Sequence, residues 1–146
     1  MSDAPALDFL PPEWFTRAVT APCESRYVDA GGTAIHYLSW NPHDTHKPGV
    51  VLAHGFRAHA RWWSFIAPFL TERFRVVALD FGGMGDSGNR VEYSNENYAR
   101  DLLAVISDAG FDRPAIVGHS FGGRQVLQMC AAHPEHVGRA IIVDSY

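Results

Sequence analysis

Short apolar runs separated by amphipathic stretches recur along the chain and predict alternating strands and helices. The apolar runs are too short for helices and are bounded by turn-forming residues, whereas the longer stretches between them place apolar residues at helical spacing. Strands are therefore predicted at 50–53, 74–79 and 139–143 and in the run that begins at Ala115, and helices at 61–72, 95–109 and, after Ser120, up to residue 132.

The N-terminal part has a different pattern. Residues 24–29 and 33–40 are strand-like and flank Ala30-Gly31-Gly32, which predicts a hairpin. Residues 1–22 are rich in proline and are expected to be irregular, with Trp14 and Phe15 folding back onto the body. Because parallel neighbours need crossover connections, a hairpin followed by strand–helix units predicts an α/β fold, a mostly parallel sheet with helices on both faces. No repeat or linker divides residues 1–146, so we expect a single domain.

The two longer helical patterns predict which side chains face the core. Each presents one apolar stripe, and the second pattern ends at Gly110, a residue typical of helix C-termini. The predicted inward residues are Trp62, Phe65, Ile66 and Phe69 in the first helix, and Tyr98, Leu102, Val105 and Ile106 in the second.

Composition narrows the classes of function. The 12 basic and 16 acidic residues give a net charge of −4, which disfavours nucleic acid or an anionic membrane as partner. Cys23 and Cys130 are too few for a disulfide framework or a zinc site, and residues 1–6 lack the pattern of a signal peptide. No apolar run approaches the length of a membrane span. We expect a cytoplasmic protein that acts on a small molecule without metal or cofactor.

The run from Ala115 to Gly123 contains Gly118-His119-Ser120-Phe121-Gly122, an apolar strand that ends in Gly-x-Ser-x-Gly and continues into a helix. Such a turn crowds the backbone, so Gly118 and Gly122 must lack side chains and Ser120 is pushed outward. The pattern alone is weak, but strand, turn and helix stand in the order that a nucleophile elbow needs. Ser120 is therefore predicted to be a nucleophile in acyl transfer or a related hydrolysis.

A second motif, Gly83-Met84-Gly85-Asp86-Ser87-Gly88, matches the dinucleotide fingerprint G-x-G-x-x-G. That fingerprint must open a helix at once, so that the helix N-terminus meets the pyrophosphate. Here residues 89–94 intervene, and no later strand ends in an acid at the required distance. We interpret the segment as a turn-rich loop.

Three motifs together resemble the α/β-hydrolase superfamily: His54-Gly55-Phe56, the loop 80–87, and the elbow around Ser120. The resemblance extends from Glu24 to Tyr146 and implies an α/β-hydrolase fold truncated after its sixth strand, hence an incomplete domain without the lid and last strands. The chain departs from the family pattern at Gly82, where arginine or proline is usual, and at Arg124, where a small residue is usual.

The resemblance assigns roles to both loops. The backbone N–H groups of Phe56 and Phe121 are implied to form the oxyanion hole, and their side chains to line the acyl pocket. Gly55 and His119 are expected to contact substrate. His54 is more consistent with a residue that braces the loop than with a catalytic one.

The groups that would activate Ser120 are less defined. Serine needs a hydrogen-bonded base, and His133 and His136 are expected one helix length away, so the resemblance implies a histidine beyond Tyr146. Asp144 ends the last strand on the same rim as Ser120 and is a candidate acid, although a structural role is favoured for it. Asp80 is likewise expected to brace its loop.

The resemblance and the serine at position 120 together favour carboxylic-ester hydrolysis. Epoxide hydrolases and haloalkane dehalogenases need a carboxylate nucleophile, whereas carbon–carbon bond hydrolases and cofactor-free haloperoxidases share the serine elbow and stay open. A non-catalytic fragment is the alternative from another class. Residues 140–143 resemble a strand buried on both faces, whose free edge would need a complementary C-terminal chain or segment.

Overall fold

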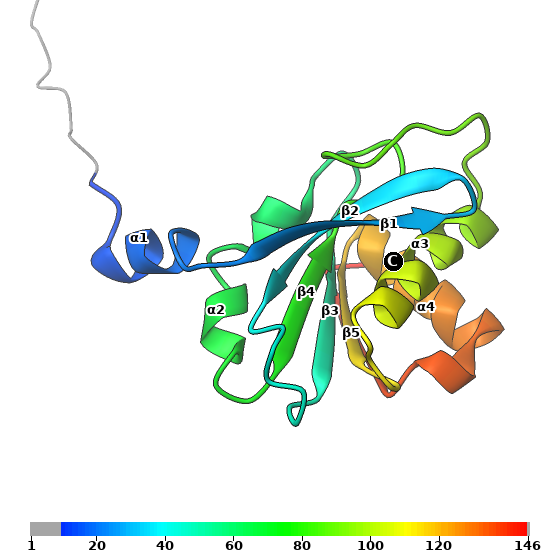
Figure 1. Ribbon diagram of the computed structural model, residues 1–146. Coiled ribbons are helices and arrows are strands. Elements are labelled where there is room, and N and C mark those ends of the chain that lie inside the picture. Colours follow the sequence, from blue (N-terminus) through cyan, green and yellow to red (C-terminus); the bar gives the residue numbers. More distant parts are fainter. Residues whose placement is uncertain (1–9, 146) are drawn as a thin grey trace, which may run out of the picture.

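The computed structural model describes residues 10–145. The stretch inspected for a signal peptide lies outside the described residues. Six strands form one sheet in the order β1-β2-β4-β3-β5-β6 (Figure 1). The strands are β1 Glu24–Ala30, β2 Thr33–Trp40, β3 Gly49–Ala53, β4 Arg75–Leu79, β5 Ala115–His119 and β6 Arg139–Val143.

The sheet is mostly parallel, as predicted. The β1–β2 hairpin pairs antiparallel, and β2 also pairs antiparallel with β4, whereas the β3–β4, β3–β5 and β5–β6 pairs are parallel. All five residues of β3 are buried, which explains why this strand is a continuous apolar run without alternation. The carboxyl ends of β3, β5 and β6 consequently meet at one edge of the sheet.

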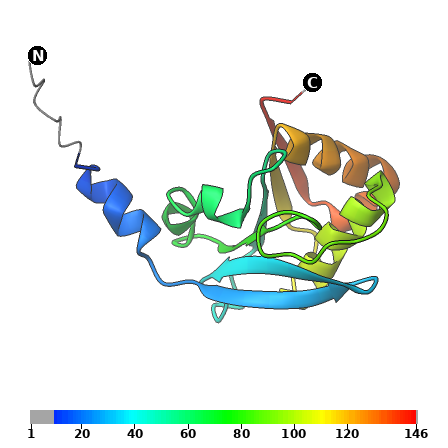
Figure 2. The ribbon, with the colours of Figure 1, turned by 90° about the horizontal axis from the view of Figure 1, so that it is seen from above.

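Helical segments cover both faces of the sheet (Figure 2). On one face lie a 3-10 turn, Ala60–Trp63, and α2, Ala67–Leu70, and on the other lie α3, Asn95–Asp108, and α4, Phe121–Ala132. The α/β-hydrolase-like alternation of strand and helix predicted from the sequence is therefore present.

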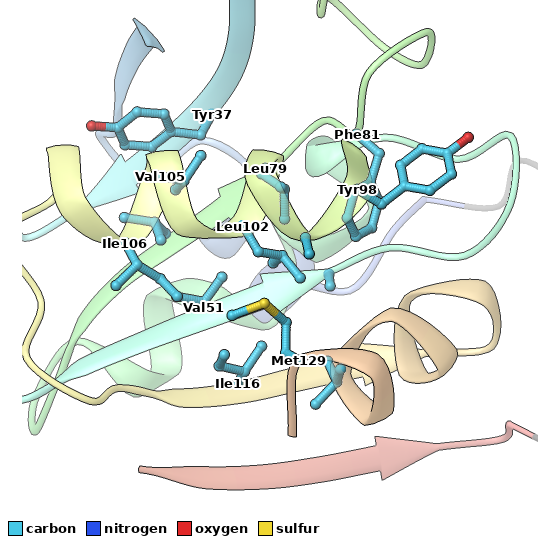
Figure 3. Packing of buried hydrophobic residues seen from close by; sticks show 14 of the residues in the cluster. Tyr37, Val51, Leu79, Phe81, Tyr98, Leu102, Val105, Ile106, Ile116 and Met129 are labelled. Atoms are coloured by element: carbon cyan, nitrogen blue, oxygen red, sulfur yellow. The ribbon is translucent and has the colours of Figure 1, made fainter. Parts of the chain in front are cut away.

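The core under α3 and α4 confirms the predicted inward face of α3. Leu102, Val105 and Ile106 pack with Met129 of α4 against β3, β4 and β5 (Figure 3). Ser94 begins α3 by accepting a hydrogen bond from the Asn97 N–H at 3.2 Å, a typical N-cap. At the other end Gly110 has φ +68°, a conformation in which glycine avoids the penalty of a side chain.

The prediction of one helix over 61–72 is wrong. The segment divides into the 3-10 turn and the short α2, and the residues buried there are Ala60, Trp63 and Ala67, whereas Trp62 and Phe69 are exposed. Pro68 explains the division, because proline fits the first turn of a helix but inside a longer helix would lose a hydrogen bond and clash with the preceding turn.

The prediction that residues 1–22 are irregular is wrong for its described second half, where Glu13–Val19 forms α1. Glu13 and Arg17 form an ion pair at 2.5 Å, four residues apart on this helix. Trp14 and Phe15 do fold back, with ring centroids 6.2 Å from Phe69 and 5.9 Å from Phe65 respectively.

Strand β6 carries exposed apolar side chains. Its Ile141 and Val143 are 49% and 42% exposed, and among the described residues β6 pairs with β5 alone. Residues 140–143 are thus not buried on both faces as their composition indicates, because α4 contacts this strand on one face and nothing described covers the other. None of the helices within 10–145 is long and apolar enough to span a membrane.

Candidate active site

Ser120 occupies a strained turn between β5 and α4. Its backbone has φ +52° and ψ −114°, a region that non-glycine residues rarely adopt and that costs about 1–3 kcal/mol. Such strain persists only when the surrounding structure enforces it, and it gathers at functional sites. The turn places Ser120 immediately before the first helical residue, Phe121.

Three glycines make this turn possible. A Cβ at Gly118 would lie 2.5 Å from the carbonyl carbon of Gly122, and a Cβ at Gly122 would lie 2.4 Å from the carbonyl oxygen of Ala53. The sequence predicts the need for both glycines. It does not reveal that Gly123 is also crowded, since a Cβ there would lie 2.0 Å from the Ser145 Oγ, an atom distant in the chain.

A pocket of about 220 Å³ opens beside the serine. It is lined by Phe56, Ser120, Phe121, Arg124 and Ser145. Within residues 10–145, neither the Phe56 N–H nor the Phe121 N–H donates to a protein acceptor. Phe121 is moreover the first residue of α4, where unpaired N–H groups and the helix dipole favour negative charge. Two of the residues that line the pocket therefore have backbone N–H groups without a described acceptor.

The rings at this pocket differ in their surroundings. Phe121 packs edge-on against Phe81 and Tyr98, with centroids 5.5 and 5.0 Å apart, so its ring is fixed from the interior. Phe56 lies 5.7 Å from Phe121 but is 66% exposed. The pocket consequently has one rigid aromatic wall and one wall open to solvent.

The end of β6 supports the elbow. The Ser120 N–H donates to the Val143 carbonyl at 2.9 Å, and the Ser145 hydroxyl donates to the Ser120 carbonyl at 2.7 Å. Asp144 stands between these two residues with φ +50°. Its carboxylate is exposed and accepts no hydrogen bond from any described residue. Asp144 is thus close to the elbow in the fold but is not joined to Ser120.

No histidine hydrogen-bonds to the Ser120 hydroxyl, although all eight histidines lie within the described residues. His133 follows α4, whose twelve residues separate it from Ser120 by about 18 Å. His136 is exposed, and both residues lie near the Glu135 carboxylate, at 3.9 and 3.6 Å. The expected separation of these two histidines from Ser120 is confirmed.

His54 fixes the loop that carries the Phe56 N–H. Its Nδ1–H donates to the Gly55 carbonyl at 2.7 Å, and its Nε2 accepts the Phe81 N–H at 3.1 Å. This pair of bonds requires the neutral imidazole. Burial lowers the pKa of His54 below its usual 6.5, with smaller opposing effects from the Gly55 carbonyl and the Asp80 charge. His54 therefore braces the loop, as expected.

Acid should destabilise the protein through His54. Because its folded-state pKa is lowered, the unfolded chain binds more protons below pH 6.5, and the free energy of unfolding falls as pH drops below that value. The slope contributed is at most about 1.4 kcal/mol per pH unit. Urea titrations at several pH values should show this slope in wild type and in H133Q but not in H54Q, and a slope that persists in H54Q would contradict the assignment.

Gly55 and His119 lie together next to the elbow. A Cβ at Gly55 would be 3.1 Å from the His119 Nδ1, and the His119 ring stacks on Trp62 with centroids 6.0 Å apart and planes at 15°. Neither residue lines the pocket of Ser120. Their contact with substrate stays a prediction.

The loop after β4 is held by a buried ion pair that the sequence does not predict. Arg90 bonds the Asp101 carboxylate at 2.5 Å, and the Gly82 N–H donates to the same carboxylate at 2.9 Å. A Cβ at Gly82 would lie 2.8 Å from the Arg90 guanidinium carbon. Arg90 thus fills the space beside residue 82, and the loop is fixed although it lacks the arginine or proline usual in the family.

The same loop shows why the dinucleotide interpretation fails. Gly83 and Gly85 have φ +78° and +52°, and turns and bends continue to Ser87, whereas the next helix begins only at Asn95. A Cβ at Gly85 would be 2.3 Å from the Asp80 carboxyl carbon. The glycines therefore let the loop wrap around Asp80 and do not open a helix for a pyrophosphate.

A cluster of possible metal ligands lies behind this loop. His36, Asp80 and Asp86 each place one ligand atom within 4.8 Å of the others. However, the Asp80 oxygens already accept hydrogen bonds from the Ala60 and Asp86 N–H groups, at 2.6 and 2.9 Å, and from His36. Arg61 also lines the adjoining pocket, which disfavours a cation. Hydrogen bonding accounts for this cluster without a metal.

The elbow, the loop after β3 and the strand order define an α/β hydrolase. A family model described as alpha/beta hydrolase fold matches residues 48–145, and the chain belongs to this family.

Relatives within the family differ in their chemistry. The chain is 32% identical to a fluoroacetate dehalogenase of Burkholderia sp., over 83% of this chain and 40% of the relative. It is also 32% identical to the 2-hydroxy-6-oxo-6-(2'-aminophenyl)hexa-2,4-dienoic acid hydrolase of Metapseudomonas resinovorans, over 82% and 42% respectively. A solved membrane phospholipase A, a bacterial virulence factor, superposes with a TM-score of 0.79 at 30% identity, covering 91% of this chain and 42% of that one. The chain thus spans about two fifths of the length of these relatives.

Proposed function

We propose that this chain supplies the nucleophile and the oxyanion hole of a serine hydrolase that cleaves carboxylic esters through an acyl-enzyme. One observation carries the proposal: Ser120 stands in a strained turn at the N-terminus of α4 and lines a pocket with Phe56 and Phe121, two residues whose backbone N–H groups have no acceptor among the described residues. A serine hydrolase needs this combination, because the anion forms within hydrogen-bond reach of the nucleophile.

In the proposed reaction the Ser120 Oγ attacks the ester carbonyl carbon while a base takes its proton. The carbonyl oxygen becomes negatively charged and accepts hydrogen bonds from the Phe56 and Phe121 N–H groups, a contribution of about 3–4 kcal/mol for one such donor. The ester C–O bond then breaks, and the base returns the proton to the leaving alcohol. Water releases the acid from Ser120 by the same steps. We assign the base to a histidine outside residues 1–146, and Asp144 is a candidate for orienting it.

The identity of residue 120 selects among the activities of the relatives. Epoxide hydrolases and haloalkane dehalogenases need a carboxylate at the elbow, and this chain has a serine there. Carbon–carbon bond hydrolysis is the second candidate, supported by the likeness to the dienoic acid hydrolase, and would use the same serine. Arg124 lines the pocket as an exposed cation and would favour acidic acyl groups in either reaction.

The test is acyl-enzyme trapping in the longest natural protein that contains this chain. We expect p-nitrophenyl butyrate to give a burst of p-nitrophenol and a butyryl adduct on the tryptic peptide that ends at Arg124. The 146-residue chain, assayed alone and with the remainder of the protein added, shows whether the base comes from elsewhere. Ester turnover without an adduct at Ser120 would overturn the proposal, and turnover of a ring-cleavage diketone without ester turnover would favour the second candidate.

A further inference from the structure

A hydrogen-bonded series of serine, histidine and aspartate side chains lies at the far side of the sheet from Ser120. The Ser25 Oγ is 2.7 Å from the His36 Nε2, and the His36 Nδ1 is 2.7 Å from the Asp80 Oδ2. These residues come from β1, from β2 and from the end of β4. Strands β1 and β5 are four positions apart in the sheet, which separates Ser25 from the elbow by about 19 Å. The two serines therefore belong to different sites.

The hydrogen bonds around Asp80 indicate which ring nitrogen of His36 carries a proton. Asp80 is buried and accepts from the Ala60 and Asp86 N–H groups, so its carboxylate acts as acceptor toward His36 as well. His36 must then carry a proton on Nδ1, and when the imidazole is neutral its Nε2 lone pair is left to accept from the Ser25 hydroxyl. This is the tautomer that a general base next to a serine requires.

His36 is also held rigidly. Its side chain is 1% exposed, its backbone N–H donates to the Ser87 Oγ at 2.8 Å, and the Ser87 hydroxyl donates to the Asp80 carbonyl at 2.6 Å. The Tyr27 ring lies against the imidazole with centroids 5.0 Å apart. A base fixed in this way keeps its geometry toward Ser25 without rearrangement, whereas Ser25 itself is exposed on β1 and open to reagents.

Basic and acidic side chains share the pocket beside these residues. Arg61 and His59 line a pocket of about 230 Å³ together with His36, Asp80 and Asp86. Burial raises the pKa of the Cys23 thiol, and the Arg61 guanidinium opposes that rise, so its field reaches the residue two positions before Ser25. The Arg61 guanidinium would attract an oxyanion or an anionic leaving group, and the Asp80 and Asp86 side chains in the same pocket would oppose that attraction.

We propose that Ser25 is a second nucleophile of this protein, activated by His36 and Asp80, and that it accepts acyl groups from activated esters. The Ser25 Oγ forms a bond to the carbonyl carbon as its proton passes to the His36 Nε2. The C–O bond to the leaving alcohol breaks, and the proton passes from His36 to that alcohol. Ser25 keeps the acyl group, so no oxidant, reductant or further reactant is needed. This reaction does not depend on Ser120.

The experiment uses the S120A variant and a fluorophosphonate, which reacts with activated serines. Trypsin separates the peptide that ends at Arg26, which carries Ser25, from the peptide that ends at Arg124, which carries the exposed Ser107. Ser107 is an internal standard, because no described side chain hydrogen-bonds to its hydroxyl. We expect Ser25 to react at least about 100-fold faster than Ser107, the lower end of what a positioned base contributes.

Two controls separate activation from chance reactivity. The S25A/S120A variant should lose the adduct on the Arg26 peptide, and S120A unfolded in urea should label Ser25 no faster than Ser107. An unlabelled Ser25 in folded protein, or equal rates at the two serines, would overturn the proposal. Because the elbow serine is absent from these variants, the outcome is independent of the ester hydrolysis proposed for Ser120.

Discussion

Replacing Ser120 with alanine should lower kcat/KM for ester hydrolysis by at least about 10³-fold in the protein that contains this chain. Loss of a nucleophile from a serine–histidine–acid site removes up to about 10⁶ in rate, and only binding and the oxyanion hole remain. Nothing else in the 220 Å³ pocket can replace the hydroxyl: Ser145 also lines it, but its hydroxyl already donates to the Ser120 carbonyl. Initial rates with p-nitrophenyl butyrate give the measurement.

The matched control is S107A, which removes an exposed serine hydroxyl from α3 and should leave the rate unchanged. Circular dichroism of both variants shows whether the fold is retained, and we expect no change, since alanine at position 120 loses only the hydroxyl. A single-turnover release of p-nitrophenol by S120A that disappears in S25A/S120A would belong to Ser25, which keeps its acyl group. Full activity in S120A and in S25A/S120A would contradict the assignment of Ser120.

The elbow could be predicted from the sequence because its cause is local. Gly118, Ser120 and Gly122 lie within five residues and form a recognisable motif, and the crowding at Gly118 arises within the turn itself, whereas that at Gly122 comes from the end of β3. The sheet could also be predicted from local sequence, because a continuous apolar run such as 50–53 is typical of a strand that is buried on both faces.

The parts that could not be predicted depend on residues far apart in the chain. The Ser145 hydroxyl reaches the Ser120 carbonyl across 25 positions, and His36 reaches Asp80 across 44. No periodicity or motif signals such a pair. The place of Arg124 in the pocket was only weakly indicated by the sequence. Arg124 lies four residues after Ser120 on the elbow helix, where side chains point back toward the start of the helix.

The helix predicted over 61–72 fails for a different reason, because one residue breaks a segment whose apolar spacing is helical. The apolar spacing is helical, yet Pro68 permits only a new start at that point. Buried Trp63 and Ala67 replace the predicted stripe, and Phe69 instead receives the Trp14 ring of α1. In this segment Pro68 therefore outweighs the helical periodicity of the apolar residues.

Replacing Gly122 with alanine should lower the free energy of unfolding by about 2 kcal/mol or more. The new Cβ would lie 2.4 Å from the Ala53 carbonyl oxygen and 2.6 Å from that of His54, both backbone atoms that cannot rotate away. Alanine is more favourable than glycine by about 1 kcal/mol inside a helix. Overpacking against a rigid neighbour costs about 1–3 kcal/mol or more, and here the new Cβ would clash with two carbonyl oxygens. Overpacking is thus expected to exceed the gain in helix propensity.

The G88A variant is the matched control, because its Cβ would approach no atom closer than 3.5 Å and Gly88 does not have a positive φ. Urea unfolding of wild type, G88A and G122A should leave the first two within about 1 kcal/mol of each other and shift the third to a lower midpoint. Since α4 can relieve the clash only by moving away from β3, the Phe121 N–H would move with it, and any G122A protein that folds should lose ester hydrolysis as well. A G122A midpoint equal to that of G88A would show that α4 does not rest on the end of β3, and it would contradict the proposed oxyanion hole, which needs those two elements in contact.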